Sequence, residues 1–319
     1  MTENRQPSSL FTVLVALGAN VIVALAKTVA AMLSGSASLV AEAAHSWADA
    51  GNELFLLQAE RRAAKPSDAA HPAGYGREAY VWSLFAAVGL FTAGAVVSIM
   101  HGVSQLGSSG EDSDYLVAYL VLAVAFVFEG ISFLQSYRQA HDRAEERGTS
   151  TVSHVLRTSN PTLRAVFAED SAALVGLVIA FLGILLHELT GNAVYDALGS
   201  ILVGVLLAVV ALILIDRNRR FLLGEPGSDR VNQLALAALL EHPEVERVTY
   251  LHLEYTGPER FYLVAAVDLV GNDRESDVAA DLAAIEAGVE QNPFIAEAVL
   301  TLSRPGAVAL SRHTEERTS

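Results

Sequence analysis

The stretch Gly35–Glu53, GSASLVAEAAHSWADAGNE, places four ionisable side chains in a segment whose other residues are mostly small or apolar. Glu42, His45, Asp49 and Glu53 are spaced i, i+3, i+7 and i+11, which brings all four onto one stripe of a helix. His45 and Asp49 are one helical turn apart, so both side chains can bind one ion from the same face of the helix. Because ionisable groups inside a bilayer cost about 2.5–3.5 kcal/mol each on insertion scales, such a stripe predicts a functional site.

Apolar residues in the rest of the chain form blocks long enough to cross a membrane. The 319 residues are 52% hydrophobic, with a mean hydropathy of +0.37, and a spanning helix needs about 20 residues. We therefore predict an integral membrane α-helical protein with six transmembrane helices. Their expected ranges are Leu10–Leu33, Ala37–Leu57, Tyr80–Leu106, Tyr115–Phe133, Leu163–Leu186 and Val194–Ile215.

Positive charge is confined to alternate loops of this topology. Arg or Lys residues follow the second, fourth and sixth apolar blocks, whereas the loops SGSAS, GSSGEDSD and HELTGN contain neither residue. Since Lys and Arg mark the cytoplasmic side, both termini are expected in the cytoplasm. The expected location is a bacterial cytoplasmic (inner) membrane.

The pattern changes after Asp216, where shorter amphipathic and alternating segments replace the apolar blocks. The expected order is helix Arg230–Leu240, strands Glu246–Tyr255 and Phe261–Val270, helix Asp277–Gln291 and strand Ile295–Leu302. This order predicts a cytoplasmic α+β (αββαβ) domain with both helices on one face of a sheet. We expect a six-helix transmembrane domain at residues 1–216, this α+β domain at 217–305 and a disordered tail at 306–319.

Composition excludes several classes of function. The chain has no cysteine, which rules out disulfides and thiolate metal sites. The segment from Glu225 onward contains seven Arg and seventeen Asp or Glu residues. Because this segment is acidic, no nucleic-acid partner is expected. The HELTG sequence at His187 begins like a zinc-protease motif but lacks its second His. No nucleophile or cofactor loop accompanies the stripe, and we expect neither an enzyme nor a cofactor.

Three further acidic residues lie near the starts of the last two apolar blocks. Glu169 and Asp170 are about 100° apart around their helix, and Asp196 opens the next block, where a helix-start role is more common than a ligand role. Imidazole nitrogen with carboxylate oxygens suits zinc or a neighbouring first-row ion.

Other ionisable residues of the apolar blocks allow more than one interpretation. Glu42 and Glu53 lie toward the two ends of their helix and are equally well explained as solvated or capping residues. Lys27 either snorkels toward the interface or pairs with a carboxylate such as Glu129.

The stretch Gly35–Glu53, together with DAAHPAGYGREAY at Asp68–Tyr80, resembles the cation diffusion facilitators, the zinc-transporter family. The resemblance covers nearly the whole chain. It implies a homodimer, a tetrahedral site between helices two and five, and metal-for-proton antiport out of the cytoplasm. His45 and Asp49 match the family's ligand positions on helix two.

Helix five departs from the family pattern of His-x-x-x-Asp. Asp170 aligns with the Asp, but Val166 occupies the His position, and Glu169 is the candidate for the missing ligand. This Glu-Asp start is similar to the branch that contains the mitochondrial zinc transporter of animals. A carboxylate-rich site raises the prospect of manganese, iron or cobalt beside zinc.

The resemblance also bears on the cytoplasmic loop. Some family members bind an extra metal there through Asp and two His. Asp68 and His71 match two of these positions, whereas Tyr75 stands at the third, so any loop site is expected to be weak.

Two other functions remain open from the sequence. One is a membrane metal sensor or scaffold that binds ions without transport. The other is a proton-coupled carrier of something else, in which His45 and Asp49 form a proton relay.

Overall fold

The computed structural model describes residues 10–107 and 115–311. Contacts divide the chain into two compact units. The first contains the chain up to residue 61 and residues 80–219, and the second contains residues 62–79 with the chain from residue 220 onward.

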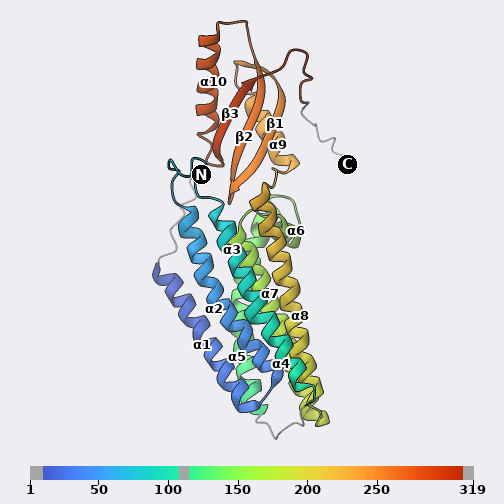
Figure 1. Cartoon of the computed structure of the whole chain (residues 1–319). Coiled ribbons are helices and arrows are strands. Elements are labelled where there is room, and N and C mark those ends of the chain that lie inside the picture. The colour runs from blue at the N-terminus through green and yellow to red at the C-terminus, as the bar shows by residue number, and fades with distance from the viewer. Residues whose placement is uncertain (1–9, 108–114, 312–319) are drawn as a thin grey trace. The chain divides into compact units, whose positions relative to one another are not determined.

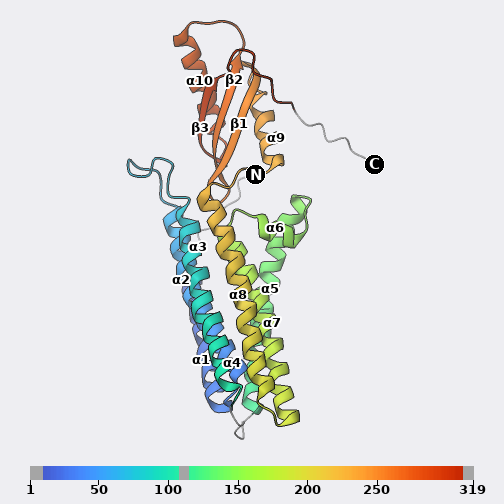
Figure 2. The same ribbon diagram turned by 45° about the vertical axis from the view of Figure 1, so that its right-hand side comes forward.

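The first unit is a bundle whose long helices run alongside one another (Figures 1 and 2). These helices are α1 (Leu10–Ser34), α2 (Ala37–Ala63), the continuous helix α3–η1–α4 (Glu78–Gly89, Leu90–Val96 and Val97–Gln105), α5 (Tyr115–Glu146), α7 (Pro161–Thr190) and α8 (Val194–Leu223). A short helix, α6 (Thr151–Arg157), connects α5 to α7.

Four helices in the described residues are long and apolar enough to cross a membrane: Glu78–Gln105, Tyr115–Glu146, Pro161–Thr190 and Val194–Leu223. Residues Asn20–Ser34 of α1 form a shorter apolar helix. Helix α2 falls outside the group of four because its ionisable stripe lowers its hydropathy. The prediction of a multi-pass helical membrane protein is confirmed.

Helix α5 extends well beyond the predicted apolar block, which ended at Phe133. The helix continues to Glu146 through a polar, charged segment, because helix-forming residues such as Gln, Arg, Ala and Glu need no apolar pattern to continue a helix. Helix α6 was not predicted. Ser150 caps its first turn by accepting a hydrogen bond from the backbone N–H of Ser153.

Helices α4 and α8 pack with their backbones close together. A Cβ added at Gly102 would lie 2.8 Å from the carbonyl oxygen of Ala197, and one added at Gly204 would lie 3.0 Å from that of Ala95. Glycine at these two positions therefore permits the close helix approach that is common in membrane bundles.

The second unit contains the predicted αββαβ order. Its elements are α9 (Asp229–Leu239), β1 (Val245–Gly257), β2 (Arg260–Leu269), α10 (Glu275–Val289) and β3 (Ile295–Leu302). Strands β1 and β2 form an antiparallel hairpin, and β3 pairs in parallel with β2, which gives the sheet order β1-β2-β3.

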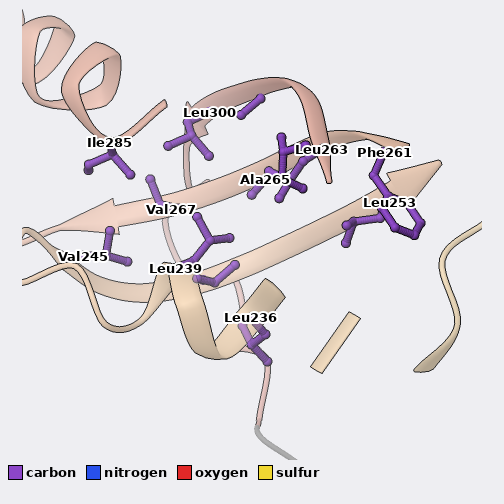
Figure 3. Packing of buried hydrophobic residues seen from close by; sticks show 13 residues of the cluster. Leu236, Leu239, Val245, Leu253, Phe261, Leu263, Ala265, Val267, Ile285 and Leu300 are labelled. Atoms are coloured by element: carbon purple, nitrogen blue, oxygen red, sulfur yellow. The ribbon is translucent and has the colours of Figure 1, made fainter. Parts of the chain in front are cut away.

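Side chains from both helices of this unit and from the sheet form one apolar cluster (Figure 3). Leu263, Ala265 and Val267 alternate along β2, so their side chains point to one face. These residues belong to one apolar cluster with Leu239 of α9 and Ile285 of α10. The second unit thus has a hydrophobic core of its own.

The tail was expected to be disordered from residue 306. Its first residues instead follow β1, because the guanidinium of Arg247 donates to the carbonyl oxygen of Ala307 at 3.2 Å and the N–H of Leu310 donates to the carbonyl oxygen of Val248 at 2.8 Å. The rest of the expected tail, residues 312–319, lies outside the described residues.

Candidate metal site

Helix α2 starts at a tightly built corner. Gly35 adopts a left-handed backbone conformation with φ 65°, which glycine permits at little cost. The Ser36 hydroxyl then accepts a hydrogen bond from the N–H of Leu39 at 3.1 Å, as an N-cap does. This corner fixes the rotation of α2 and therefore the direction in which its ionisable stripe points.

Asp196 completes this corner from the start of α8. Its carboxylate accepts hydrogen bonds from the Ser36 hydroxyl at 2.8 Å, from the N–H of Ser38 at 3.2 Å and from the N–H of Ala37. A carboxylate at the positive end of a helix is also favoured by the helix dipole. The structure therefore gives Asp196 a helix-start role, and the helix that it caps is α2 rather than its own.

His45 and Asp49 lie side by side on α2, with His45 Nδ1 3.4 Å from Asp49 Oδ1. His45 is fully buried. Neither of its ring nitrogens has a hydrogen bond to any part of the chain that the structure describes. A buried imidazole normally has such a partner, so this residue is the most informative feature of the stripe.

Glu169 of α7 faces α2. Its Oε1 accepts a hydrogen bond from the side-chain amide of Asn52, which lies one turn beyond Asp49 on α2. The Glu169 side chain is buried. The α2–α7 interface therefore contains an imidazole, an amide and two carboxylates.

Asp170 of α7 faces α5 instead. Its carboxylate accepts hydrogen bonds from the Ser136 hydroxyl at 2.9 Å and from the Ser132 hydroxyl at 3.1 and 3.2 Å. Both serines, with Val166 of α7 and Glu60 of α2, line a mostly polar cavity of about 320 Å³. The two neighbouring acids of α7 thus turn toward different helices.

The ends of the α2 stripe contact α1. Glu42 Oε2 accepts a hydrogen bond from Lys27 Nζ at 3.0 Å, and Glu129 of α5 lies 3.8 Å from the same ammonium. Glu53 Oε1 accepts a hydrogen bond from the Asn20 amide at 2.8 Å. Of the alternatives for Lys27, the structure shows pairing with carboxylates.

Within residues 10–107 and 115–311, no group of three or more His, Asp or Glu side chains is close enough to hold a metal ion together. The candidate ligands His45, Asp49, Glu169 and Asp170 therefore come from two adjacent helices but do not converge on one point in this conformation. Binding by all four would require these side chains, or the helices that carry them, to rearrange.

The loop candidates lie in the second unit. The Asp68 carboxylate accepts hydrogen bonds from the N–H of Ala70 at 2.9 Å, from the N–H of His71 at 2.8 Å and from the Tyr75 hydroxyl at 2.7 Å. The Tyr75 hydrogen bond is the main reason that the pKa of Asp68 is lowered. The carboxylate is thus already engaged in its own turn, and His71 Nδ1 lies 3.6 Å from it.

Sequence reasoning missed Asn52, Ser132 and Ser136. A weak signal exists for the serines, because they are spaced i, i+4 near the end of an apolar block and a hydroxyl pair on one helix face suits a buried acceptor. Nothing in the spacing of Asn52 shows that it faces α7.

Residues 13–223 match the family model described as the cation efflux transmembrane domain. Metal tolerance protein C4 of Arabidopsis thaliana is 36% identical over 238 residues, which cover 75% of this chain and 52% of that protein. The human protein named proton-coupled zinc antiporter SLC30A9, mitochondrial, is 32% identical over 259 residues, 81% of this chain and 46% of that protein.

A bacterial relative, the putative transporter MamV of Paramagnetospirillum magneticum, is 28% identical over 225 residues, 70% of this chain and 62% of that protein. The chain spans about half the length of the plant and human relatives. The family match covers the whole helical unit that holds the His45–Asp49 stripe. The chain belongs to the cation efflux family of metal transporters, the cation diffusion facilitators, and resembles its SLC30A9 branch.

Proposed function

We propose that this protein is a secondary transporter that exchanges a divalent transition metal, zinc first, for protons and exports it from the cytoplasm. The observation that carries the proposal is the buried His45–Asp49 pair on α2, which lies against the α7 helix that carries Glu169 and Asp170. The name of the human relative, a proton-coupled zinc antiporter, supports the same choice of ion and coupling.

The proposed ligands are His45 and Asp49 of α2 with Glu169 and Asp170 of α7. His45 offers an unengaged ring nitrogen, and Asp49 offers an Oδ1 without a hydrogen-bond partner among the described residues. Glu169 and Asp170 can exchange hydrogen bonds for metal bonds. One nitrogen and three oxygens fit the four-coordinate preference of zinc. Because oxygen-rich sites also accept harder ions, manganese, iron and cobalt remain within the proposed range.

Helices α1 and α2 complete the proposed set of six spans, with both termini in the cytoplasm. The polar stripe of α2 is turned inward toward α1 and α7, as the Lys27–Glu42 and Asn52–Glu169 contacts show. Apolar side chains such as Leu54 are exposed on the same helix. An intramembrane stripe that faces the bundle interior is how ionisable residues are accommodated in a spanning helix.

The proposed mechanism is alternating access of the α2–α7 site. Movement of one helix group against another would expose the site first to the cytoplasm and then to the opposite side. Metal ions and protons compete for the same imidazole and carboxylate atoms, so binding of one releases the other. A homodimer, which is typical of the family, is the proposed assembly.

Zinc uptake into reconstituted vesicles with an imposed pH gradient tests this proposal. We expect Asp49→Ala to abolish uptake while the protein remains assembled, because it removes a ligand from the centre of the stripe. Asp142→Ala, at an exposed position of α5, is the matched control and should transport normally. Near-normal uptake by Asp49→Ala would remove Asp49 from the site, and zinc binding without any wild-type flux would favour the sensor or scaffold function.

A further inference from the structure

Lys27 is a fully buried cation in the C-terminal half of α1. The side chain has 0% exposure, and its ammonium lies 3.0 Å from Glu42 on α2 and 3.8 Å from Glu129 on α5. A lysine in this environment is costly unless it is paired. The helix bundle therefore holds the Lys27 ammonium beside Glu42, at one end of the stripe that carries His45.

The bundle also contains a space for the Glu42 side chain. Gly176 of α7 faces this carboxylate, and a Cβ added there would overlap Glu42 Oε1. This oxygen has no hydrogen-bond partner among the described residues. Glu42 is thus held through one oxygen by Lys27, while its second oxygen lies against the backbone of α7.

Glu42 lies one turn before His45 on the same face of α2. Without a neighbouring cation, its carboxylate would be one more oxygen ligand within reach of an ion at His45. The ammonium of Lys27 bonds to one of its oxygens and makes the pair neutral. Glu129 is also placed to share the charge of Lys27, which leaves the carboxylates farther along α2 and on α7 for the ion.

We propose that Lys27 determines which ion the site prefers, because it neutralises Glu42 and keeps that carboxylate out of the metal's coordination. This inference rests on the proposed function as a divalent metal carrier. Removal of the ammonium would free Glu42 to join His45 and Asp49. The enlarged, oxygen-rich site would then suit manganese better and zinc less well.

The test compares Lys27→Met, Glu42→Gln and the double variant Lys27→Met/Glu42→Gln with the wild type. Zinc and manganese compete in two assays: uptake into vesicles and equilibrium binding to the purified protein. We expect Lys27→Met to reduce the preference for zinc over manganese roughly tenfold, because a freed carboxylate adds a hard ligand. The double variant should regain the wild-type preference, and Glu42→Gln alone should keep it.

An unchanged preference in a folded Lys27→Met variant would overturn the proposal, as would a double variant that stays shifted toward manganese. If Lys27→Met does not fold, Glu42→Gln still decides: a retained preference for zinc supports the exclusion of Glu42 from the wild-type coordination, whereas a lost preference makes Glu42 a ligand and overturns the proposal. The binding assay separates the two proposals. If the wild type binds zinc but does not take it up into vesicles, the proposed transport function is wrong. The role of Lys27 is tested separately, by the zinc-over-manganese binding preference of the variants relative to the wild type.

Discussion

Replacement of Asp196 by alanine should destabilise the helical unit without removing a metal ligand. The carboxylate accepts hydrogen bonds from the Ser36 hydroxyl and from the N–H groups of Ala37 and Ser38. Hydrogen bonds to a charged group contribute about 1.5–3 kcal/mol each. Because such contributions are not additive, we expect a total loss of about 3–5 kcal/mol for the buried network. For a chain of this size that corresponds to a melting temperature lower by about 10 °C.

Thermal unfolding of the purified protein in detergent measures this loss, and Asp196→Asn is the matched control. The amide keeps one acceptor oxygen at the same position, so it should lose less stability than the alanine variant. At a temperature where both variants are folded, zinc uptake should persist in both. An unchanged melting temperature in Asp196→Ala would refute the capping role, and a stable variant that no longer binds zinc would make Asp196 a ligand.

Three further perturbations test the helix packing at Gly199, the turn at Asp68 and the independence of the C-terminal unit. Gly199→Ala should lower the melting temperature, because the new Cβ would overlap the Ser38 hydroxyl and such overpacking costs about 1–3 kcal/mol; an unaltered melting curve would contradict the close approach. Tyr75→Phe should raise the pKa of Asp68 toward its ordinary value, since the hydroxyl that stabilises the carboxylate is lost. If ¹³C NMR titration gives the Asp68 carboxyl group the same pKa in the variant and the wild type, this role of Tyr75 is wrong. The isolated segment 220–311 should fold as a soluble acidic dimer. Circular dichroism that shows an unfolded segment, or sedimentation that shows a monomer, would contradict this.

Hydropathy predicted the four helices of the described residues that are long and apolar enough to span a membrane, because the bilayer sets the length and polarity of such helices. It gave the wrong end for α5, since the charged segment up to Glu146 continues the helix outside the apolar block. It did not reveal α6, because this helix has only seven residues and no long apolar run. The αββαβ order was predictable because period-2 and period-3.6 patterns are both clear in that part of the chain.

The candidate site was predictable only where its residues share one helix. The spacing of His45 and Asp49 places them together whatever the tertiary structure. The hydrogen bonds of Glu169 to Asn52 and of Asp170 to Ser136 join different helices, and no local pattern specifies which helices pack together.

Zinc-edge X-ray absorption shows whether His45 coordinates the transported ion. The purified protein is loaded with one equivalent of zinc, and His45→Ala is compared with the wild type and with the control His252→Ala. We predict imidazole scattering at a zinc–nitrogen distance of about 2.0–2.1 Å in the wild type and the control. The same scattering should be absent from His45→Ala, and its persistence there would contradict the proposed site.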